Sequence, residues 1–132
     1  MIYIYTTTSC SGCRKAILWL KERNYQYVEK NFFQTKLTKK DLLFILEHTD
    51  NGFDDIISKR SKVIKDNNID VDEMSFSEII DFIINNPSCL RRPIMVDDGK
   101  LQVGYNEDEI RRFLPREVRQ LELAQAQQLA GY

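Results

Sequence analysis

Two cysteines three positions apart carry the most distinctive chemistry in this sequence. Cys10 and Cys13 enclose Ser11-Gly12 in a CxxC pattern, which follows the aromatic and β-branched run Met1 to Tyr5 and precedes residues at helical spacing. A helix N-terminus offers unpaired N–H groups and positive potential to a thiolate, so Cys10 should be the more nucleophilic thiol. Cys13, one helical turn later, is placed to attack a mixed disulfide or sulfenate on Cys10. The pattern predicts a pair that switches between dithiol and disulfide.

Two other interpretations of the CxxC pattern remain open, namely half of a zinc site or two inert core cysteines. Zinc needs about four ligands, and only Cys89 and His48 remain as candidates to complete the set. We therefore favour redox chemistry and expect neither a metal nor a cofactor. Cys89 is most simply a small, partly buried side chain. His48 is expected on the surface or in the last turn of a helix rather than as a catalytic base.

A strand, a helix and a second strand are expected to position the cysteines. Met1 to Tyr5 predicts a buried strand. Helical spacing begins at Ser11 and ends near Asn24. Tyr25 to Phe33, with Val28 as a core candidate, predicts the second strand. The resulting β-α-β unit with a parallel pair is the opening of a thioredoxin-like fold.

The middle of the chain predicts a series of helices. Thr38 and Asp41 have the spacing of a capping box at a helix start, and Asp50-Asn51-Gly52 predicts a helix end with a turn. A later helix begins at Ser75 or Ser77. We interpret this region as a helical insertion between two halves of a sheet.

The last third of the chain predicts two antiparallel strands followed by helices. Pro93 to Val96 and Leu101 to Val103 form a hairpin around the turn at Asp97-Asp98-Gly99-Lys100. Asn106 opens a helix through Phe113, and Pro115 starts a last helix. The expected class is α/β, with a thioredoxin-like mixed four-stranded sheet (β-α-β then β-β-α) and a helical insertion between the halves. We expect one domain over 1–132, with a redox core from 1–35 and 90–132 and the insertion at 38–86.

The run Arg91-Arg92-Pro93 is a second feature with chemical potential. A proline that begins a strand in a thioredoxin-like fold is often cis and packs against the CxxC pair. An arginine placed there can approach Cys10 and stabilise its thiolate. The competing interpretation is two solvated arginines, which we would prefer without the context of the fold.

Length, hydropathy and charge exclude several classes of protein. The 132 residues suit one domain, and no apolar run approaches the roughly 20 residues that span a bilayer. The N-terminus lacks the pattern of a secretory signal, so we expect a cytoplasmic protein that does not contact membranes. Nineteen basic and 20 acidic side chains leave a net charge of −1. This balance disfavours wholesale phosphate neutralisation, so any role at a gene should run through another protein.

Five segments in order make the chain closely resemble the Spx family. They are the CxxC pair, the Gly52 turn, Arg60-Ser61-Lys62, Leu90-Arg91-Arg92-Pro93-Ile94 and the stretch from Val103 to Pro115. Spx proteins are redox-responsive transcription regulators of low-GC Gram-positive bacteria, in the arsenate-reductase-like branch of the thioredoxin superfamily. The resemblance covers nearly the whole chain, and its last segment is far more specific than a CxxC.

The resemblance implies a global regulator of thiol and oxidative stress that binds the C-terminal domain of the RNA polymerase α subunit. Such a protein activates some promoters and blocks activators at others, under the control of a Cys10–Cys13 thiol/disulfide switch. Gly52 corresponds to the family's polymerase-contact glycine, although a glycine also suits the turn itself. We expect contact with DNA only within the polymerase complex and a monomer when free.

The resemblance also implies supporting residues and a further partner. Arg92 matches the arginine near the redox pair, beside Pro93, and Arg60 and Lys62 match basic residues of the redox-linked and interaction surface. The tail Leu129-Ala130-Gly131-Tyr132 is similar to the family's exposed degradation signal, which the ClpXP protease reads, but it departs from that signal by ending in Gly-Tyr.

The competing function is that of an arsenate reductase, in which a cysteine attacks an oxyanion held by several arginines. Arg60 and Arg92 fit two of that family's arginines, whereas Tyr105 stands where the third is expected. The CxxC also supplies an internal resolving thiol that glutaredoxin-linked reductases lack at that place. A regulator that is not an enzyme is therefore the preferred prediction, and no catalytic residue is assigned.

Overall fold

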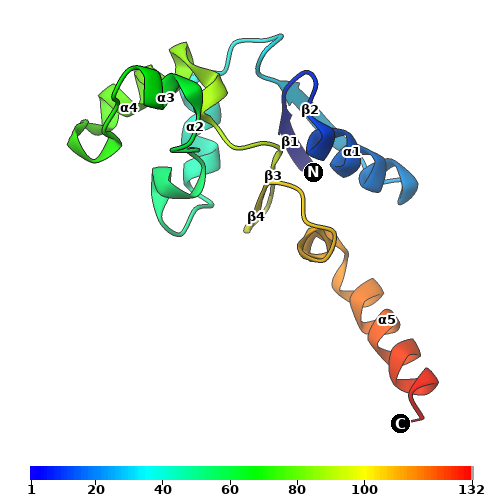
Figure 1. The fold of residues 1–132 in the computed structure, drawn as a ribbon. Coiled ribbons are helices and arrows are strands. Elements are labelled where there is room, and N and C mark those ends of the chain that lie inside the picture. The colour runs from blue at the N-terminus through cyan, green and yellow to red at the C-terminus, as the bar shows by residue number, and fades with distance from the viewer. Residues whose placement is uncertain (132) are drawn as a thin grey trace.

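Four short strands form one mixed sheet in the order β2-β1-β3-β4 (Figure 1). The computed structural model describes residues 1–131. The strands are β1 (Ile2–Thr6), β2 (Tyr27–Asn31), β3 (Ile94–Asp97) and β4 (Lys100–Val103). β1 and β2 are parallel, while β3 is antiparallel to both β1 and β4. The predicted thioredoxin-like mixed four-stranded sheet is confirmed.

Helix α1 (Ser11–Glu22) follows β1 and ends two residues before the predicted asparagine, Asn24. Asn24 has a φ of 56°, in the left-handed region that asparagine tolerates better than most residues. Two backbone hydrogen bonds close the end of the helix, from Asn24 N to Lys21 O at 3.1 Å and from Tyr25 N to Leu20 O at 3.0 Å. This double closure fixes the direction in which the chain enters β2.

Strand β2 is shorter than the predicted run of Tyr25 to Phe33, and Val28 is not a core residue. Val28 is 36% exposed because β2 lies at the edge of the sheet. Tyr25, which was expected to begin the strand, lies before β2 and packs edge-to-face on Trp19, with 5.8 Å between the ring centroids. At the other end, Phe32 N donates to Thr6 O at 3.0 Å before the chain turns away.

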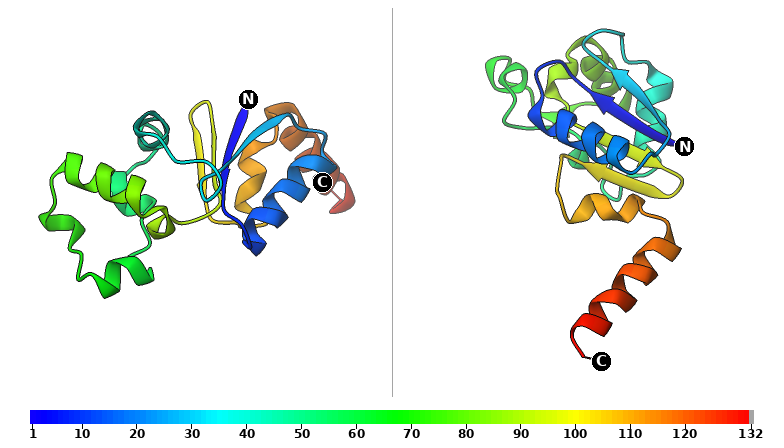
Figure 2. Two further views of the ribbon diagram at one scale, coloured as in Figure 1. Left: turned by 90° about the horizontal axis from the view of Figure 1, so that it is seen from above. Right: turned by 90° about the vertical axis from the view of Figure 1, so that its right-hand side faces the viewer.

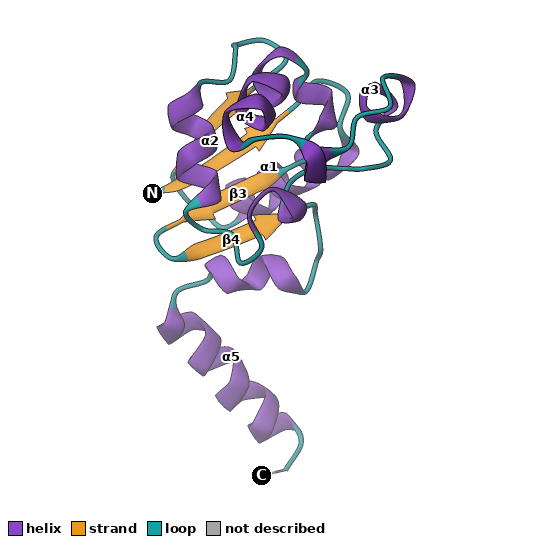
Figure 3. Ribbon diagram, turned by 90° about the vertical axis from the view of Figure 1, so that its left-hand side faces the viewer, coloured by secondary structure: helices purple, strands orange, loops and turns teal. Residues whose placement is uncertain are grey.

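The insertion between β2 and β3 consists of three α-helices joined by single turns of 3₁₀ helix (Figures 1 and 3). Its elements are α2 (Lys39–Leu46), η1 (Gly52–Asp55), α3 (Lys62–Asp66), η2 (Val71–Glu73), α4 (Phe76–Asn85) and η3 (Pro87–Cys89). The capping box at Thr38 and Asp41 is confirmed, and Ser75 caps α4 in the same way with Glu78. The predicted end of α2 at Asp50 to Gly52 was wrong, because i→i+3 bonds already close the helix after Leu46.

The segment after β4 differs from the predicted α-helix. Asn106 to Phe113 contains only a 3₁₀ helix, η4 (Glu109–Phe113). Proline at 115 disfavours helical backbone at the residue before it, and Leu114 is indeed extended. Helix α5 (Arg116–Leu129) then projects away from the body (Figure 1), and none of its side chains is buried.

The alternation of side chains along β1 divides the interior into two cores. The insertion covers one face of the sheet, and α1 and η4 cover the other (Figure 2). Tyr5 pairs with Ile94 and faces the insertion, whereas Ile4 pairs with Met95 and faces α1 and η4. The cysteines of the CxxC pair therefore begin the helix that covers the face opposite the insertion. Within residues 1–131, no helix has the length and apolar character required to cross a membrane.

Candidate redox site

Cys10 is the N-cap residue of α1, between the end of β1 and the first helical turn. Its backbone is extended, with φ −110° and ψ 111°, and its Sγ accepts a hydrogen bond from Cys13 N at 3.1 Å. The sulfur thus takes the place of the side-chain oxygen that usually caps a helix. A thiolate at this atom receives both a hydrogen bond and the positive end of the helix.

Cys13 lies in the first turn of α1 and is buried. Burial raises the pKa of the Cys13 thiol to about 12, and contact with the Cys10 side chain raises it as well. A hydrogen bond from the Thr7 backbone and the positive charge of Arg92 act in the opposite direction. Both cysteines of the pair are free thiols, and they differ sharply in solvent access.

Pro93 packs directly against the CxxC turn. The Arg92–Pro93 peptide bond is cis, and Pro93 Cδ lies 3.4 Å from the point where a Cβ on Gly12 would stand. The Arg92 guanidinium stacks 5.5 Å from the centroid of the Phe33 ring and donates to Ser88 O at 3.4 Å. Its charge acts to lower the pKa of Cys13 and of Cys89, against the larger effect of burial.

The two residues that could have extended the pair to a metal site lie in other environments. Cys89 is fully buried in the core on the insertion side, and burial raises the pKa of its thiol to about 11. His48 Nδ1 lies 2.9 Å from Phe44 O, just beyond the end of α2. Within the part of the chain that the structure describes, no three His, Cys, Asp or Glu side chains gather as metal ligands.

Gly52 opens η1 with a φ of +64°, a conformation that favours glycine. A Cβ added to Gly52 would meet nothing within 4 Å, so this face of the turn is open. The turn is fixed by Asp55 Oδ2, which accepts from the backbone N–H groups of Asp50 and Asn51 at 3.0 Å each. These bonds thus hold the two residues before Gly52, and the space where its Cβ would stand is open.

Basic side chains from the insertion and from the start of β3 line one open groove. The groove has a volume of about 830 Å³, and it brings Arg60 together with Arg92. Its other basic lining residues are Lys59 and Arg91. Lys62 is not among the lining residues, and neither cysteine of the pair is. Lys59 and Arg91 are far apart in the sequence, and only the tertiary fold places both on one groove beside Arg92.

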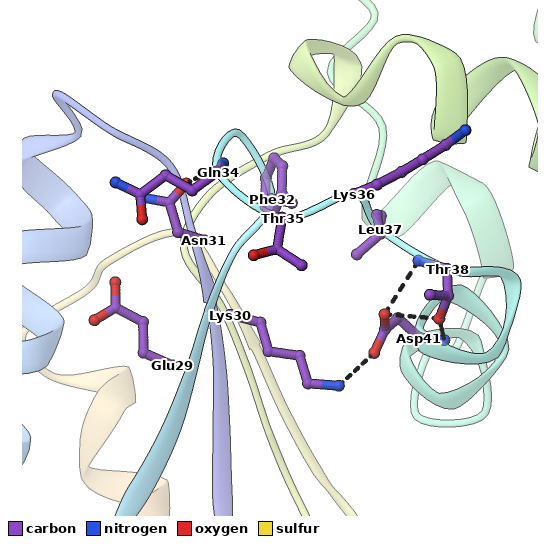
Figure 4. A pocket seen from close by; sticks show the side chains of 10 residues that line it. All are labelled: Glu29, Lys30, Asn31, Phe32, Gln34, Thr35, Lys36, Leu37, Thr38 and Asp41. Atoms are coloured by element: carbon purple, nitrogen blue, oxygen red, sulfur yellow. Dashed lines mark hydrogen bonds and ion pairs between the residues drawn. The ribbon is translucent and has the colours of Figure 1, made fainter.

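A second pocket, of about 460 Å³, lies beside β2 and the loop that leads to α2 (Figure 4). Lys30 Nζ donates to Asp41 Oδ1 at 2.8 Å across this pocket, and Tyr5 OH donates to the same oxygen at 3.3 Å. Asp41 also closes the capping box with Thr38. These bonds connect the start of α2 to two strands of the sheet.

Comparison with known proteins decides the family. The ArsC family model matches residues 5–113. The global transcriptional regulator Spx of Enterococcus faecalis is 51% identical over 131 residues, which cover 99% of both chains. The chain belongs to the Spx family. A second Spx, the global transcriptional regulator of Bacillus subtilis, is 48% identical over 131 residues, which cover 99% of this chain and 100% of that protein.

Solved structures place this Spx-family chain among ArsC-like folds. A putative ArsC-family-related protein from Bacteroides fragilis matches with a TM-score of 0.70 and 21% identity, covering 84% of this chain and 95% of its own. An arsenate reductase from Vibrio cholerae matches with a TM-score of 0.71 and 17% identity, covering 86% and 94%. At these identities the solved structures show the shared fold alone. The names of the Spx relatives support transcription regulation rather than catalysis.

Proposed function

We propose that this Spx-family protein regulates transcription by binding the C-terminal domain of the RNA polymerase α subunit, with Cys10 and Cys13 as its thiol/disulfide switch. The observation that carries the proposal is the unequal pair at the start of α1, with an N-cap sulfur beside a buried thiol. The similarity to relatives named global transcriptional regulators supports the regulatory role.

The switch works by a two-step oxidation. An electrophilic oxidant first reacts with the Cys10 thiolate, and Cys13 then displaces the adduct from Cys10. One Sγ–Sγ bond forms, and the oxidant takes up two electrons and two protons. The short link between Cys10 and Cys13 keeps both sulfurs within one helical turn, so the second step is intramolecular.

The redox part is tested with diamide, followed by alkylation and mass spectrometry under denaturing conditions. The expected product is one peptide that carries both cysteines and has lost two hydrogens, with Cys89 still alkylated as the internal control. Reduction with dithiothreitol should restore both thiols. Full alkylation of Cys10 and Cys13 after diamide treatment contradicts the switch.

The partner contact is proposed at Gly52, where the backbone is open to approach. Gly52→Arg places a long cation in this contact and should weaken binding to the purified α C-terminal domain by more than about tenfold. Gly99→Arg is the matched control, because Gly99 also has a positive φ, of 69°, and open space around its Cβ position.

Both substitutions place an arginine in a left-handed backbone conformation, at a similar cost in stability of roughly 1–2 kcal/mol. A difference in binding between the two variants therefore reports on the proposed contact at Gly52. Affinity is measured by titration, and folding is checked by thermal melting. A folded Gly52→Arg protein that binds like wild type, or an equal loss of binding in Gly99→Arg, removes the assignment.

The basic groove is the observation that favours a second candidate, an arsenate reductase. Arg60 and Arg92 both line it, as oxyanion-binding arginines would. Neither Cys10 nor Cys13 lines the groove. An assay with arsenate and thiol reductants should therefore show far less than the turnover of about 1 per second at the low end of typical enzymes, and turnover above that rate would favour the enzyme.

The tail is proposed as a recognition element for the ClpXP protease. Helix α5 projects from the body with all of its side chains accessible to some degree. Tyr132, on which the departure from the family's tail depends, lies outside the described residues. Degradation by purified ClpXP, compared with a variant that has two aspartates as its last residues, tests whether the Gly-Tyr ending is recognised.

A further inference from the structure

Gly12, the residue inside the CxxC pair, rests against two side chains from the open end of the β3–β4 hairpin. A Cβ on Gly12 would lie 3.4 Å from Pro93 Cδ and equally 3.4 Å from Tyr105 Cβ. Pro93 precedes β3 and Tyr105 follows β4, so the two residues bracket the hairpin. The CxxC turn therefore has two packing neighbours on this side, and only Pro93 was anticipated from the sequence.

The backbone on the N-terminal side of Tyr105 is held by hydrogen bonds. Gly104 N donates to Pro93 O at 2.8 Å, which ties the two neighbours of Gly12 to each other. The buried Gln102 side chain donates to Gly104 O at 3.3 Å. Gly104 has a φ of 79°, which a glycine adopts readily and which turns the chain from β4 toward α1.

The chain is also fixed directly after Tyr105. Asn106 Oδ1 accepts from Asp108 N and from Glu109 N at 2.9 Å each. These bonds form a tight turn that leads into η4, whose Ile110 and Phe113 are buried under α1. Hydrogen bonds thus hold the residues on both sides of Tyr105 in place.

The Tyr105 side chain lies along the first half of α1. It is partly buried and packs on the core that contains Ala16 and Trp19. Lys15 Nζ lies 5.9 Å from the centroid of the Tyr105 ring. Gly12 and Lys15 are one helical turn apart on α1, so Tyr105 packs along the turn that contains Cys13.

We propose that Tyr105 is a positioning residue for the Cys10–Cys13 pair, which keeps the first turn of α1 where the two sulfurs can join. This inference rests on the proposed switch and adds to it a residue outside the CxxC pattern. The side chain acts through its ring, which packs on the core under α1 and faces Lys15, and it does not touch the reacting sulfurs.

The expected effect follows from the closing reaction. In a glutathione buffer the two thiols and one glutathione disulfide give the protein disulfide and two glutathiones, so electrons and protons balance. Holding two groups in place raises their effective concentration toward each other. Without Tyr105, the first turn moves more freely, and the equilibrium shifts toward the dithiol.

The test measures the equilibrium constant of the protein with defined mixtures of oxidised and reduced glutathione, by acid quenching, alkylation and mass spectrometry. Tyr105→Ala should lower the constant by about tenfold, whereas Tyr105→Phe should stay within about twofold of wild type because the packing ring is kept. Tyr25→Ala is the matched control, because Tyr25 packs on the same core at the opposite end of α1. Tyr25→Ala should leave the equilibrium constant within about twofold of wild type. It should lower the free energy of unfolding about as much as Tyr105→Ala does, because both remove a packed ring.

The outcomes separate this inference from the proposed switch. Failure of the wild-type protein to form the disulfide at any glutathione ratio overturns the switch itself. A wild-type protein that cycles, with an unchanged constant in Tyr105→Ala or an equal shift in Tyr25→Ala, overturns only the role of Tyr105. If Tyr105→Ala is unfolded by circular dichroism, Tyr105→Leu takes its place, and a constant equal to that of wild type then overturns the proposal.

Discussion

The two sulfurs of the CxxC pair have different surroundings although they are only three residues apart. Cys10 caps the helix and accepts the N–H of Cys13, while Cys13 points into the interior and has a pKa raised to about 12 by burial. A thiol with a raised pKa stays protonated through the neutral range, so Cys13 is not expected to attack an oxidant before Cys10 does. The order of events in the proposed switch thus follows from the geometry of the pair.

We expect iodoacetamide to modify Cys10 well before Cys13 in the folded, reduced protein at pH 7 to 8. Time-resolved mass spectrometry of the peptide that contains both residues measures the two rates. Because the pKa of Cys13 is raised, its rate should climb only as the pH approaches 12. Cys89, also buried, serves as the protected reference. Equal rates at Cys10 and Cys13 would contradict the assigned roles.

Gly12→Ala should be tolerated. The added Cβ would meet Pro93 and Tyr105 at 3.4 Å, at the short end of ordinary van der Waals contact, and Gly12 has no positive φ that an alanine would strain. Alanine is favoured over glycine within a helix by up to about 1 kcal/mol. Urea denaturation should show equal or higher stability than wild type, and a loss above about 1 kcal/mol would mean that the packing is too tight for a methyl group.

At the scale of elements, one carboxylate joins the insertion to the sheet. Asp41 caps α2 together with Thr38 and also accepts from Lys30 (Figure 4). Tyr5 donates to the same carboxylate. Burial alone would raise the pKa of Asp41, but the hydrogen bonds from Lys30 and Thr38 outweigh it and hold this pKa below its usual value. The ionised form is therefore the one that stabilises the fold.

Asp41→Asn should lower the free energy of unfolding by about 1 kcal/mol at neutral pH, the usual loss for a helix cap. Since the folded-state pKa lies below the unfolded value, the contribution is present above pH 4 and is lost as the pH falls through the folded pKa. Urea denaturation of both proteins between pH 7 and pH 3 should show the difference shrinking.

Glu78→Gln is the control for that measurement. Glu78 closes the capping box of α4 but is fully exposed and has neither a lysine nor a tyrosine partner among its hydrogen bonds. Glu78→Gln should lower the free energy of unfolding by less than Asp41→Asn does. A pH-independent deficit in Asp41→Asn would show that the ionised carboxylate is not the stabilising form.

Local signals predicted the elements better than they predicted the surroundings of each residue. Capping at Thr38 and the left-handed Asn24 depend on a few neighbouring residues, so the sequence was sufficient to place them. Val28 was misplaced because its alternation does not reveal that β2 is an edge strand. The segment expected as a helix after Asn106 is a 3₁₀ helix that ends before Leu114, the residue whose backbone Pro115 restricts.

In the candidate site, too, local features could be predicted from the sequence and tertiary contacts could not. The CxxC pair and Pro93 are visible in the sequence because their spacing and context are local. Tyr105 was noticed only as a departure from another family's arginine, since nothing in its neighbourhood indicates that it packs against Gly12. The contact depends on the register of the β3–β4 hairpin, which is a property of the assembled sheet.

At the scale of the whole molecule, α5 stands apart from both cores. None of its side chains is buried, and the ion pair between Arg111 and Glu122 connects it to η4. Both partners of this pair are more than a third exposed, and ion pairs of this kind contribute about 0–1 kcal/mol. The stability of the body should hardly depend on this helix.

Removal of residues 116–132 should therefore lower the free energy of unfolding by less than about 1 kcal/mol. Chemical denaturation of the shortened and full-length proteins measures the difference, and the disulfide should still form with diamide in both. A loss above about 2 kcal/mol would show that α5 packs on the body in solution, because only buried contacts give losses of that size.

The order of the sheet leaves β2 and β4 as its two edges, and edges are where sheets of separate molecules join. Charged side chains lie at both edge strands. Glu29 and Lys30 occupy the middle of β2, and Arg112 donates to the Leu101 carbonyl of β4 at 2.6 Å. A strand from another molecule would have to displace these charges before it could pair. We therefore expect substitutions that remove the charges of Glu29, Lys30 and Arg112 to make edge-to-edge association of the sheets easier.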